Sequence, residues 1–462
     1  MRSHRMALAV IVAMFAAARV AAYAAGIRFD ADPLTWYWQY IDTVLLKERL
    51  LESLYYLHSQ PPLFNLMLGL TLKAFPAGYA TALHLQFIAM GLVTTLAFYA
   101  LLIQLGVPRT VGTVMTVCLC VLPVMVLYEN WLFYEYPTLM LLMLAPVALH
   151  RFLARDSIAA GIAFFGLAAA LIFLRSVFQF MWLFAIVAVL IAVKPRRLVI
   201  ACGVVPLAVV ALLYAKNLML FGTAATSSWL GMNLARATVS QLDPESLDTL
   251  VKAGTLHRVS STPPFSGPGA YANLAEAVPQ RGVPVLDNPL KADGGVNFNA
   301  STYLAVSRDY LADALWVMRN RPDVYRETVL EDALPLLLSS PSEFASVEGN
   351  RRKIETYDRI VGDYLYGYSP HWRRIGLGVI AAYVFAIGYA TVLLVGIARE
   401  RRLPGADALT VLFVVVTCSY VAVVTSLTEV GENQRMRFIL DPPIIACVTA
   451  GVVRLFRPLY SR

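Results

Sequence analysis

Charged residues are scarce in this 462-residue sequence: they make up 15% of it, whereas 58% of the residues are hydrophobic. A soluble protein of this length would carry roughly a quarter charged residues. The composition therefore excludes a series of soluble domains. It predicts an all-α polytopic membrane protein, because apolar runs of about twenty residues are long enough to cross a bilayer as helices.

Several motifs of soluble enzymes are missing. The sequence has no C-x-x-C pair, no glycine-rich phosphate loop and no H-E-x-x-H, so nucleotide chemistry and zinc chemistry have no support and we predict no metal site. All of the cysteines lie inside apolar runs, which argues against a disulfide framework. They are Cys118, Cys120, Cys202, Cys418 and Cys447.

The formal charge of +8 does not indicate a nucleic-acid partner. The basic residues form small clusters at the ends of apolar runs, and such clusters set the orientation of a membrane protein. Every cluster falls on one side when the runs are counted as helices, and that side is expected to be the cytoplasm. The ten expected spans lie near 6–25, 83–104, 110–127, 137–153, 158–174, 176–193, 197–215, 373–396, 407–427 and 438–455.

Ten spans predict a multi-pass protein of the plasma (inner) membrane with both termini in the cytoplasm. Residues 1–215 would form an N-terminal membrane module whose first external loop is 26–82. Residues 216–372 would form an external, periplasmic and mostly helical domain, and residues 373–462 would return to the membrane. Arg19 and the length of the first run argue for a retained anchor over a cleaved signal peptide.

Four basic residues do not follow the pattern that places basic residues on the cytoplasmic side, because they lie at the outer ends of spans. They are Arg175, Lys216, Arg435 and Arg437. Each alone could be a side chain that reaches to lipid phosphates. Together they favour an anionic ligand at the interface, because a guanidinium group binds phosphate oxygens in two places.

Acidic residues are expected on the same face. Asp30 and Asp32 follow the first span, where they form either a solvated turn or a general base whose pKa burial would raise. Glu129 and Glu135, with Tyr136, form the short outer turn before the fourth span, where they could hold an acceptor. We therefore expect acids from the front of the chain and Arg435 from its end to share one cleft.

A histidine and two prolines give the most specific local signal, His58-Ser-Gln-Pro61-Pro62-Leu63-Phe64. The prolines remove backbone donors and predict a helix that begins near Leu63. A histidine beside such a helix start can favour an anionic group, although a lone histidine is more often structural.

These residues resemble the polyprenyl-phosphate-dependent membrane glycosyltransferases of the GT-C fold, such as protein O-mannosyltransferases and lipid A aminoarabinose transferases. In that family an Asp follows the first helix, as Asp30 and Asp32 do here, and a His-Pro-Pro-Leu-Tyr-like motif closes the first loop, as in 58–64. The family's Arg/Lys-Asn-x-x-x-Phe-Gly and Gly-x-Asn-Leu segments are similar to 216–222 and 231–234. A Glu-x-x-Arg-Tyr-Arg-like element is similar to 432–437.

The sequence departs from the family pattern at three places. Two residues are inserted between His58 and Pro61, Phe64 replaces a Tyr, and Met436 replaces another Tyr. The resemblance covers the membrane part, whereas the external segment matches it faintly.

The resemblance implies an inverting transfer of a monosaccharide from a polyprenyl-phosphate donor to a lipid, glycan or protein acceptor on the outer face. Asp30 or Asp32 would be the base, and Glu129, Glu135 and Tyr136 would hold the acceptor. The donor phosphate would lie on Arg435, Arg437, Lys216, Arg175 and His58. No cofactor other than the donor is required, although some family members use a divalent metal. The alternative from another class is a secondary transporter or lipid flippase.

Overall fold

A computed structural model describes residues 2–274, 279–367, 376–400 and 403–460. Within these ranges the chain is built from helices, and its extended pairings are two isolated bridges, Asp30 with Trp131 and Leu290 with Val296. The prediction of an all-α protein is therefore confirmed.

Seven helices are long and apolar enough to cross a membrane, so the chain is a multi-pass membrane protein. An eighth span forms if one bent helix pair is counted as a single crossing. The seven are α1 (Arg2–Ala24), α6 (Tyr79–Gln104), α9 (Glu135–Arg155), α12 (Arg196–Phe221), α21 (Leu377–Glu400), α22 (Ala406–Thr428) and α23 (Asn433–Tyr460).

The bent pair replaces the single span expected at 110–127. Helix α7 (Arg109–Val121) and helix α8 (Pro123–Glu129) meet at an angle of 54°. Pro123 lacks a backbone N–H and disfavours helical torsion angles at the residue before it. Leu122 accordingly has an extended conformation, with ψ near 130°.

The span expected at 158–174 is reproduced with the same bounds, whereas the one expected at 176–193 is shorter, and neither reaches the length of the seven. Helix α10 (Ile158–Leu174) has 17 residues and helix α11 (Phe180–Val193) has 14. At 1.5 Å per residue, α11 is only about 21 Å long, which is less than the roughly 30 Å of hydrocarbon in a bilayer. The count of ten full-length spans is therefore not reproduced. Residues 176–179, which were expected to be helical, lie instead in the loop 175–179 between α10 and α11.

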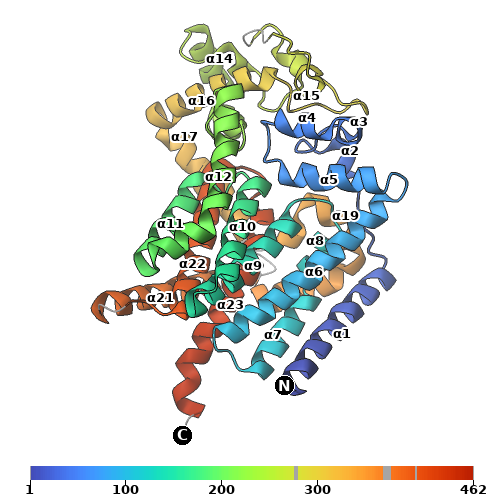
Figure 1. Cartoon of the computed structure of the whole chain (residues 1–462). Coiled ribbons are helices and arrows are strands. Elements are labelled where there is room, and N and C mark those ends of the chain that lie inside the picture. The colour runs from blue at the N-terminus through green and yellow to red at the C-terminus, as the bar shows by residue number, and fades with distance from the viewer. Residues whose placement is uncertain (1, 275–278, 368–375, 401–402, 461–462) are drawn as a thin grey trace.

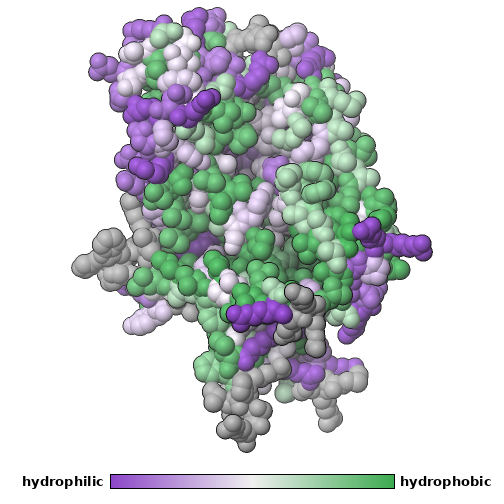
Figure 2. Space-filling view, turned by 90° about the vertical axis from the view of Figure 1, so that its left-hand side faces the viewer, coloured by the Kyte–Doolittle hydropathy of each residue, from purple (hydrophilic) through white to green (hydrophobic). Residues whose placement is uncertain are grey.

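Figure 1 shows both chain ends at one end of the molecule and helices α14–α16 at the other. Apolar residues cover the middle of the face seen in Figure 2, and hydrophilic residues gather above them. This band is the pattern that a membrane-spanning region presents to lipid.

The first loop folds into short helices that lie beside the polar end (Figure 1). They are α2 (Pro33–Trp36), α3 (Thr43–Glu48), α4 (Leu50–Tyr55) and α5 (Leu63–Ala74). Helix α5 begins at the residue expected from Pro61 and Pro62, which confirms that prediction.

The large segment after α12 is also helical, but it begins later than expected. Residue 216 lies inside α12, which continues to Phe221 and ends at Gly222 in a left-handed conformation, with φ 71°. The helices that follow are α13 (Leu230–Ala237), α14 (Pro244–Lys252), α15 (Pro284–Asp287), α16 (Thr302–Asn320), α17 (Pro322–Glu327), α18 (Leu334–Leu338), α19 (Glu348–Arg351) and α20 (Glu355–Val361), with short 3₁₀ and π turns between them.

Helices α13 and α16 cross at Gly231, where the two backbones touch. A Cβ atom at this position would lie 1.7 Å from the carbonyl oxygen of Ser307 and 2.8 Å from the amide nitrogen of Leu311. Both are backbone atoms, so the helices would have to separate.

We therefore expect Gly231→Ala to lower the free energy of unfolding by about 3 kcal/mol or more, the upper range for overpacking. Gly349→Ala is the control, because a Cβ atom there meets nothing within 4 Å. Unfolding of the two purified variants in detergent measures the difference, and equal stabilities would contradict the close crossing.

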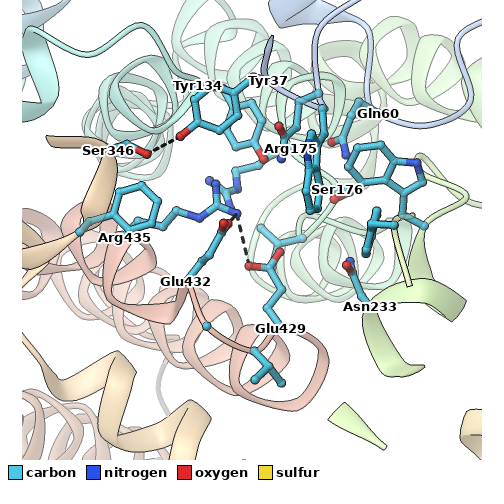
Figure 3. Close-up of a pocket in the computed structure, with 18 of the residues that line it drawn as sticks. Tyr37, Gln60, Tyr134, Arg175, Ser176, Asn233, Ser346, Glu429, Glu432 and Arg435 are labelled. Atoms are coloured by element: carbon cyan, nitrogen blue, oxygen red, sulfur yellow. Dashed lines mark hydrogen bonds and ion pairs between the residues drawn. The ribbon is translucent and has the colours of Figure 1, made fainter. Parts of the chain in front are cut away.

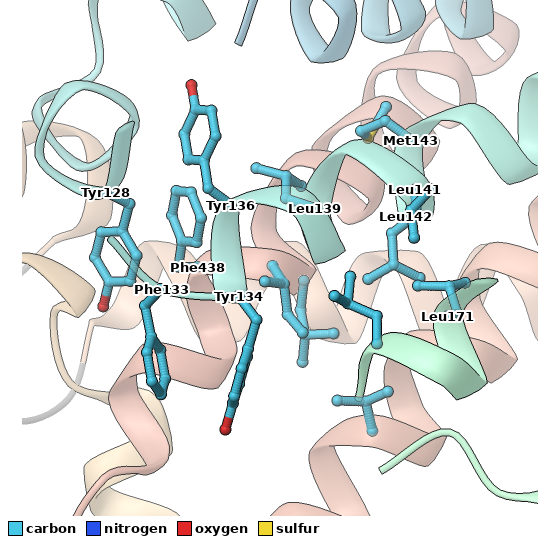
Figure 4. Close-up of a cluster of buried hydrophobic side chains, with 14 of the residues drawn as sticks. Tyr128, Phe133, Tyr134, Tyr136, Leu139, Leu141, Leu142, Met143, Leu171 and Phe438 are labelled. Carbon is cyan, nitrogen blue, oxygen red and sulfur yellow. The ribbon is translucent and has the colours of Figure 1, made fainter. Parts of the chain in front are cut away.

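A buried aromatic cluster lies where α8, α9 and α23 meet (Figure 4). The rings of Tyr128 and Phe438 are stacked with centroids 4.0 Å apart, and Phe133 and Tyr134 are stacked at 4.1 Å. Stacked rings fix the directions of the chains that carry them. Phe438, in the second turn of α23, also stacks on Tyr136 at the start of α9 with centroids 5.8 Å apart. Both α8 and the start of α9 are thus held against α23.

Candidate functional site

A cavity of about 370 Å³ opens where segments far apart in the chain meet. Its walls come from the first loop (36–39), the connections 175–177 and 343–346, and the turn 429–435 before and into α23. Tyr134, Trp229 and Arg236 are among the other lining residues. Its lining contains three arginines and three glutamates, which are Arg175, Arg236, Arg435, Glu343, Glu429 and Glu432.

Arg435, in the first turn of α23, is as deeply buried as Arg175, each with 4% of its side chain exposed. Its guanidinium group lies 2.8 Å from Glu432, 3.3 Å from Glu135 and 3.6 Å from Glu429. Figure 3 shows it pointing into the cavity towards Glu429 and Glu432. Three carboxylates thus surround one fixed positive charge, and Gly431, at φ 93°, makes the turn that brings two of them there.

Arg175 approaches the same point from the end of α10. Its Nη1 atom donates to Oε1 of Glu135 at 2.5 Å, and its guanidinium group lies over the ring of Tyr134 at 4.6 Å. One oxygen of Glu135 therefore faces both Arg175 and Arg435, whereas its other oxygen, Oε2, is buried without a hydrogen-bond partner among the described residues.

The hydrogen bonds of this cluster are incomplete. Nε of Arg435, Oε2 of Glu429 and Oε1 of Gln434 are buried and lack hydrogen-bond partners in the described part of the chain. Buried polar atoms are normally paired, so such atoms call for an explanation. An anionic ligand that takes the place of a carboxylate on Arg435 would supply acceptors in a geometry suited to guanidinium.

Aromatic rings form the opposite side of the cavity. Trp36 and Trp38 remain 54% and 41% exposed, so each offers ring surface to a ligand. Trp38 stacks on Phe265 with centroids 5.1 Å apart. Phe265 has φ +64°, a strained conformation for an aromatic residue and one that tends to persist at functional sites. Tyr37 is hydrogen-bonded to Ser346 at 2.6 Å and closes the wall between the two ends.

Asp30 and Asp32 are not brought into this cavity. The backbone of Asp30 pairs with the segment 130–132, and Oδ1 of Asp30 accepts a hydrogen bond from the amide of Asp32 at 3.0 Å. Asp30 is half-buried, and burial raises the pKa of its carboxyl group. Its bridge partner Trp131 packs on Tyr37, so Asp30 is a neighbour of the lining without being part of it. We expected acids from the front of the chain to share one cleft with Arg435. Residues 36–39 do line the cavity with Arg435, whereas Asp30 and Asp32 do not.

His58 also lies outside the cavity lining, and both of its ring nitrogens have polar partners. Its Nδ1 atom is 2.8 Å from the hydroxyl of Ser228 and its Nε2 atom is 2.9 Å from the carbonyl oxygen of Asn299. Burial, and then the charges of Lys216 and Arg281, lower the pKa of His58 to about 3. A neutral imidazole cannot supply the positive charge that phosphate binding requires.

This histidine makes the stability of the protein depend on pH. Below pH 6.5 the unfolded chain gains a proton that the folded chain, with a His58 pKa of about 3, does not gain. Stability should therefore fall as the pH drops below 6.5, by about 1.4 kcal/mol at pH 5.5. We expect His58→Gln to be less stable at pH 7 but to lose less on going to pH 5.5 than the native protein. Thermal unfolding of both proteins at the two pH values measures this, and identical pH slopes would contradict it.

The remaining predicted cations lie apart from the cavity. Nζ of Lys216 donates to the carbonyl oxygens of Tyr55 and Leu57, at 2.9 and 3.0 Å. Arg437 is buried, 3.2 Å from Asp441, and donates to the carbonyl oxygen of Leu338. Both cations therefore join segments of the fold through bonds to other protein groups.

The residues predicted to hold the acceptor also lie in two different places. Glu129 is fully buried and forms an ion pair with Arg19 at 2.8 Å, while the hydroxyl of Tyr136 donates to it at 2.8 Å. These three side chains form a closed set between α1, α8 and α9. Glu135 lies instead behind Arg175 and Arg435, where it orients both.

Sequence reasoning missed Trp38, Phe265 and Arg236 as lining residues. Trp36 and Trp38 lie in the expected first external loop, 26–82, and no ligand contact was expected of either residue. Phe265 carries no local signal, because only the fold brings it to Trp38. Within the described ranges, no group of three or more histidine, cysteine, aspartate or glutamate side chains could hold a metal ion.

No protein-family model matches the chain, and no curated protein matches it. The structure is similar to the crystal structure of the Archaeoglobus fulgidus oligosaccharyltransferase in its apo form, with 10% sequence identity and a TM-score of 0.36. The match covers 98% of this chain and 51% of that one, so this chain spans about half the length of that enzyme.

Proposed function

We propose that the chain is a membrane glycosyltransferase with a GT-C-like helix arrangement. It would move a monosaccharide from a polyprenyl-phosphate donor to an acceptor at the outer face of the plasma membrane. The observation that carries this proposal is the cavity at the head of α23, with buried Arg435 at one end and exposed indole rings at the other. A sugar phosphate has a matching pair of ends, because its phosphate binds guanidinium and its pyranose face packs on aromatic rings.

The donor phosphate would bind to Arg435 by replacing a carboxylate. Glu432 is the partner best placed to leave, because 40% of its side chain is exposed whereas Glu135 is fully buried. When the sugar–phosphate bond breaks, negative charge grows on the phosphate that leaves. Arg435 and Arg175 are already fixed by Glu135, so they would stabilise that charge without reorganising.

The sugar would then lie towards Trp36 and Trp38, and the acceptor would enter from the external side. In an inverting displacement the acceptor oxygen attacks the anomeric carbon, its proton passes to a carboxylate, and the polyprenyl phosphate departs. Both chain termini would be cytoplasmic, with the segment after α12 outside. The acceptor remains a lipid, glycan or protein. No step in this scheme requires a metal, so added chelator is expected to leave the rate unchanged.

Two carboxylates compete for the role of base. Asp30 has the position that the resemblance implies for the base and a pKa raised by burial, but it does not line the cavity. Glu432 lines the cavity, and a phosphate that displaces it from Arg435 would free it to accept a proton.

The variants Asp30→Asn and Glu432→Gln separate these assignments. Removal of the true base should lower kcat by about 10²–10⁴-fold, the usual contribution of a positioned base, while donor binding persists. The other variant should retain most of its activity. Loss of activity in neither variant would remove both residues from the mechanism.

The overall proposal is tested by incubating the purified protein with a panel of polyprenyl-phosphate sugars and following hydrolysis or transfer. The matched control is the same panel with Arg435→Lys, which keeps the charge but not the two-point geometry. Absence of turnover with any donor, together with donor movement across proteoliposome membranes, would favour a flippase instead.

A further inference from the structure

Gln60 is one of the two residues inserted between His58 and Pro61, where the sequence departs from the family pattern. The structure places it in the wall of the cavity at Arg435, and only 9% of the residue is exposed. The insertion therefore adds a polar side chain to the candidate site, and the proposed function has not yet used this side chain.

The backbone around Gln60 is held in place by hydrogen bonds. The amides of the two preceding residues donate to Oδ1 of Asn299, at 2.9 and 3.0 Å. The hydroxyl of Ser227 donates to the carbonyl oxygen of Ser59 at 2.6 Å. Pro61 follows directly and restricts the torsion angles that Gln60 can adopt. The Gln60 side chain thus starts from a fixed point, as the positioning of a bound ligand requires.

The side-chain amide of Gln60 makes no hydrogen bond within the part of the chain that the structure describes. Two other amides of the cavity lining are in the same state. Oε1 of Gln39 is buried without a partner among the described residues, and the side chain of Asn233, on α13, has no partner there either. Buried polar groups are normally paired, so three unpaired amides around one cavity point to a ligand that supplies their partners.

The wall that the first loop contributes to the cavity carries no charge. It consists of 36–39 and Gln60, so it combines two amides with two exposed indole rings. Figure 3 shows Gln60 and Asn233 across the cavity from Arg435. An amide offers a donor and an acceptor together, and a sugar hydroxyl also both donates and accepts. Rings that pack on a sugar face, beside amides that bind its hydroxyls, form a wall suited to a neutral carbohydrate.

We propose that Gln60, with Gln39 and Asn233, binds the ring hydroxyls of the sugar and so determines which sugar is accepted. The sugar would be a neutral one with free hydroxyls, because neutral amides supply no counter-charge to a charged substituent. A sugar that lacks the hydroxyl facing Gln60 would leave this amide buried and unpaired, which costs affinity. The inference rests on the proposed function for the presence of a sugar in the cavity, and it adds the residue that selects the sugar.

The first test needs no variant. It measures the affinity of the purified full chain, in detergent, for geranyl phosphate and for the geranyl phosphate esters of glucose, galactose, mannose and arabinose. At least one ester should bind more tightly than geranyl phosphate. Among deoxy analogues of that ester, each lacking one ring hydroxyl, at least one should bind about tenfold more weakly than the parent. Equal affinity for geranyl phosphate and every ester, or for the preferred ester and every deoxy analogue, would overturn the proposal.

The second test assigns the missing hydroxyl to Gln60. Gln60→Met keeps the length of the side chain but removes its donor and acceptor. It should lower the affinity for the preferred ester, relative to that for geranyl phosphate, by about tenfold, and it should bind one of the weaker deoxy analogues as tightly as the parent ester. Gln280→Met, at an exposed glutamine outside the cavity lining, should keep the native preferences.

A Gln60→Met protein that discriminates among the deoxy analogues as the native protein does would overturn the role of Gln60. This failure can be told apart from failure of the proposed function. Turnover of a donor by a protein whose affinities do not depend on Gln60 would overturn this inference alone. Binding that depends on the sugar and on Gln60, without turnover of any donor, would support the subsite and overturn the proposed transfer.

Discussion

Arg435→Ala is expected to lower kcat/KM for sugar transfer by about 10²–10³-fold, the usual cost of removing a positioned donor from a developing negative charge. Arg435 is nearly enclosed, lies among three carboxylates, and belongs to the cavity that would hold the donor phosphate. The rate should fall through donor binding and through the chemical step together.

The measurement is steady-state transfer from the donor identified in the panel, with thermal stability followed in parallel. Because Arg435→Ala also leaves buried Glu135 with less compensation, Arg435→Lys serves as the better folded companion and should have intermediate activity. Arg326→Ala removes an exposed charge on α17 and should be neutral. Native activity in Arg435→Ala would show that the cavity at α23 is not the donor site.

The largest effect on stability is expected at the ion pair of Arg19 with Glu129. Glu129 has no exposed surface and Arg19 binds it through two nitrogens, while Nη1 of Arg19 also donates to the carbonyl oxygen of Cys120. Glu129→Ala would leave the guanidinium group buried without its counter-charge. We expect a loss of about 3–5 kcal/mol in the free energy of unfolding.

The double variant Arg19→Met with Glu129→Gln should lose less than Glu129→Ala alone. Replacing both partners removes the isolated charge, and a buried pair costs desolvation energy that neutral side chains avoid. Unfolding in detergent, followed by loss of helical signal, compares the proteins. If the double variant were the less stable one, the pair would contribute more than its desolvation cost.

Much of the fold could be predicted from the sequence, because hydrophobic length and proline position are local properties. The start of α5 after Pro62 and the all-helical membrane part follow from them. The break at Leu122 also had a local signal in Pro123, although the run appeared continuous by hydrophobicity. The shortness of α11 had no such signal, because residues 176–179 are turned out of the helix by tertiary contacts such as the bond from Tyr214 to Gln179.

The site could be predicted only in part. Arg175 and Arg435 drew attention because charge at the outer end of a span is unusual, and the structure brings both to Glu135. The same rule selected Lys216 and Arg437, which bind carbonyl groups or an acid elsewhere. Charge position reveals that a cation needs a partner, but side-chain direction decides whether the partner is a ligand or the protein itself.

The sharing of Glu135 between two arginines has a mechanical consequence. A single carboxylate ties the end of α10 to the beginning of α23, so the protein is braced at this point. An incoming phosphate that replaces Glu432 on Arg435 would leave the contact with Glu135 in place. Occupancy would then keep α10 and α23 joined, so ligand binding would require no movement of these two helices relative to each other.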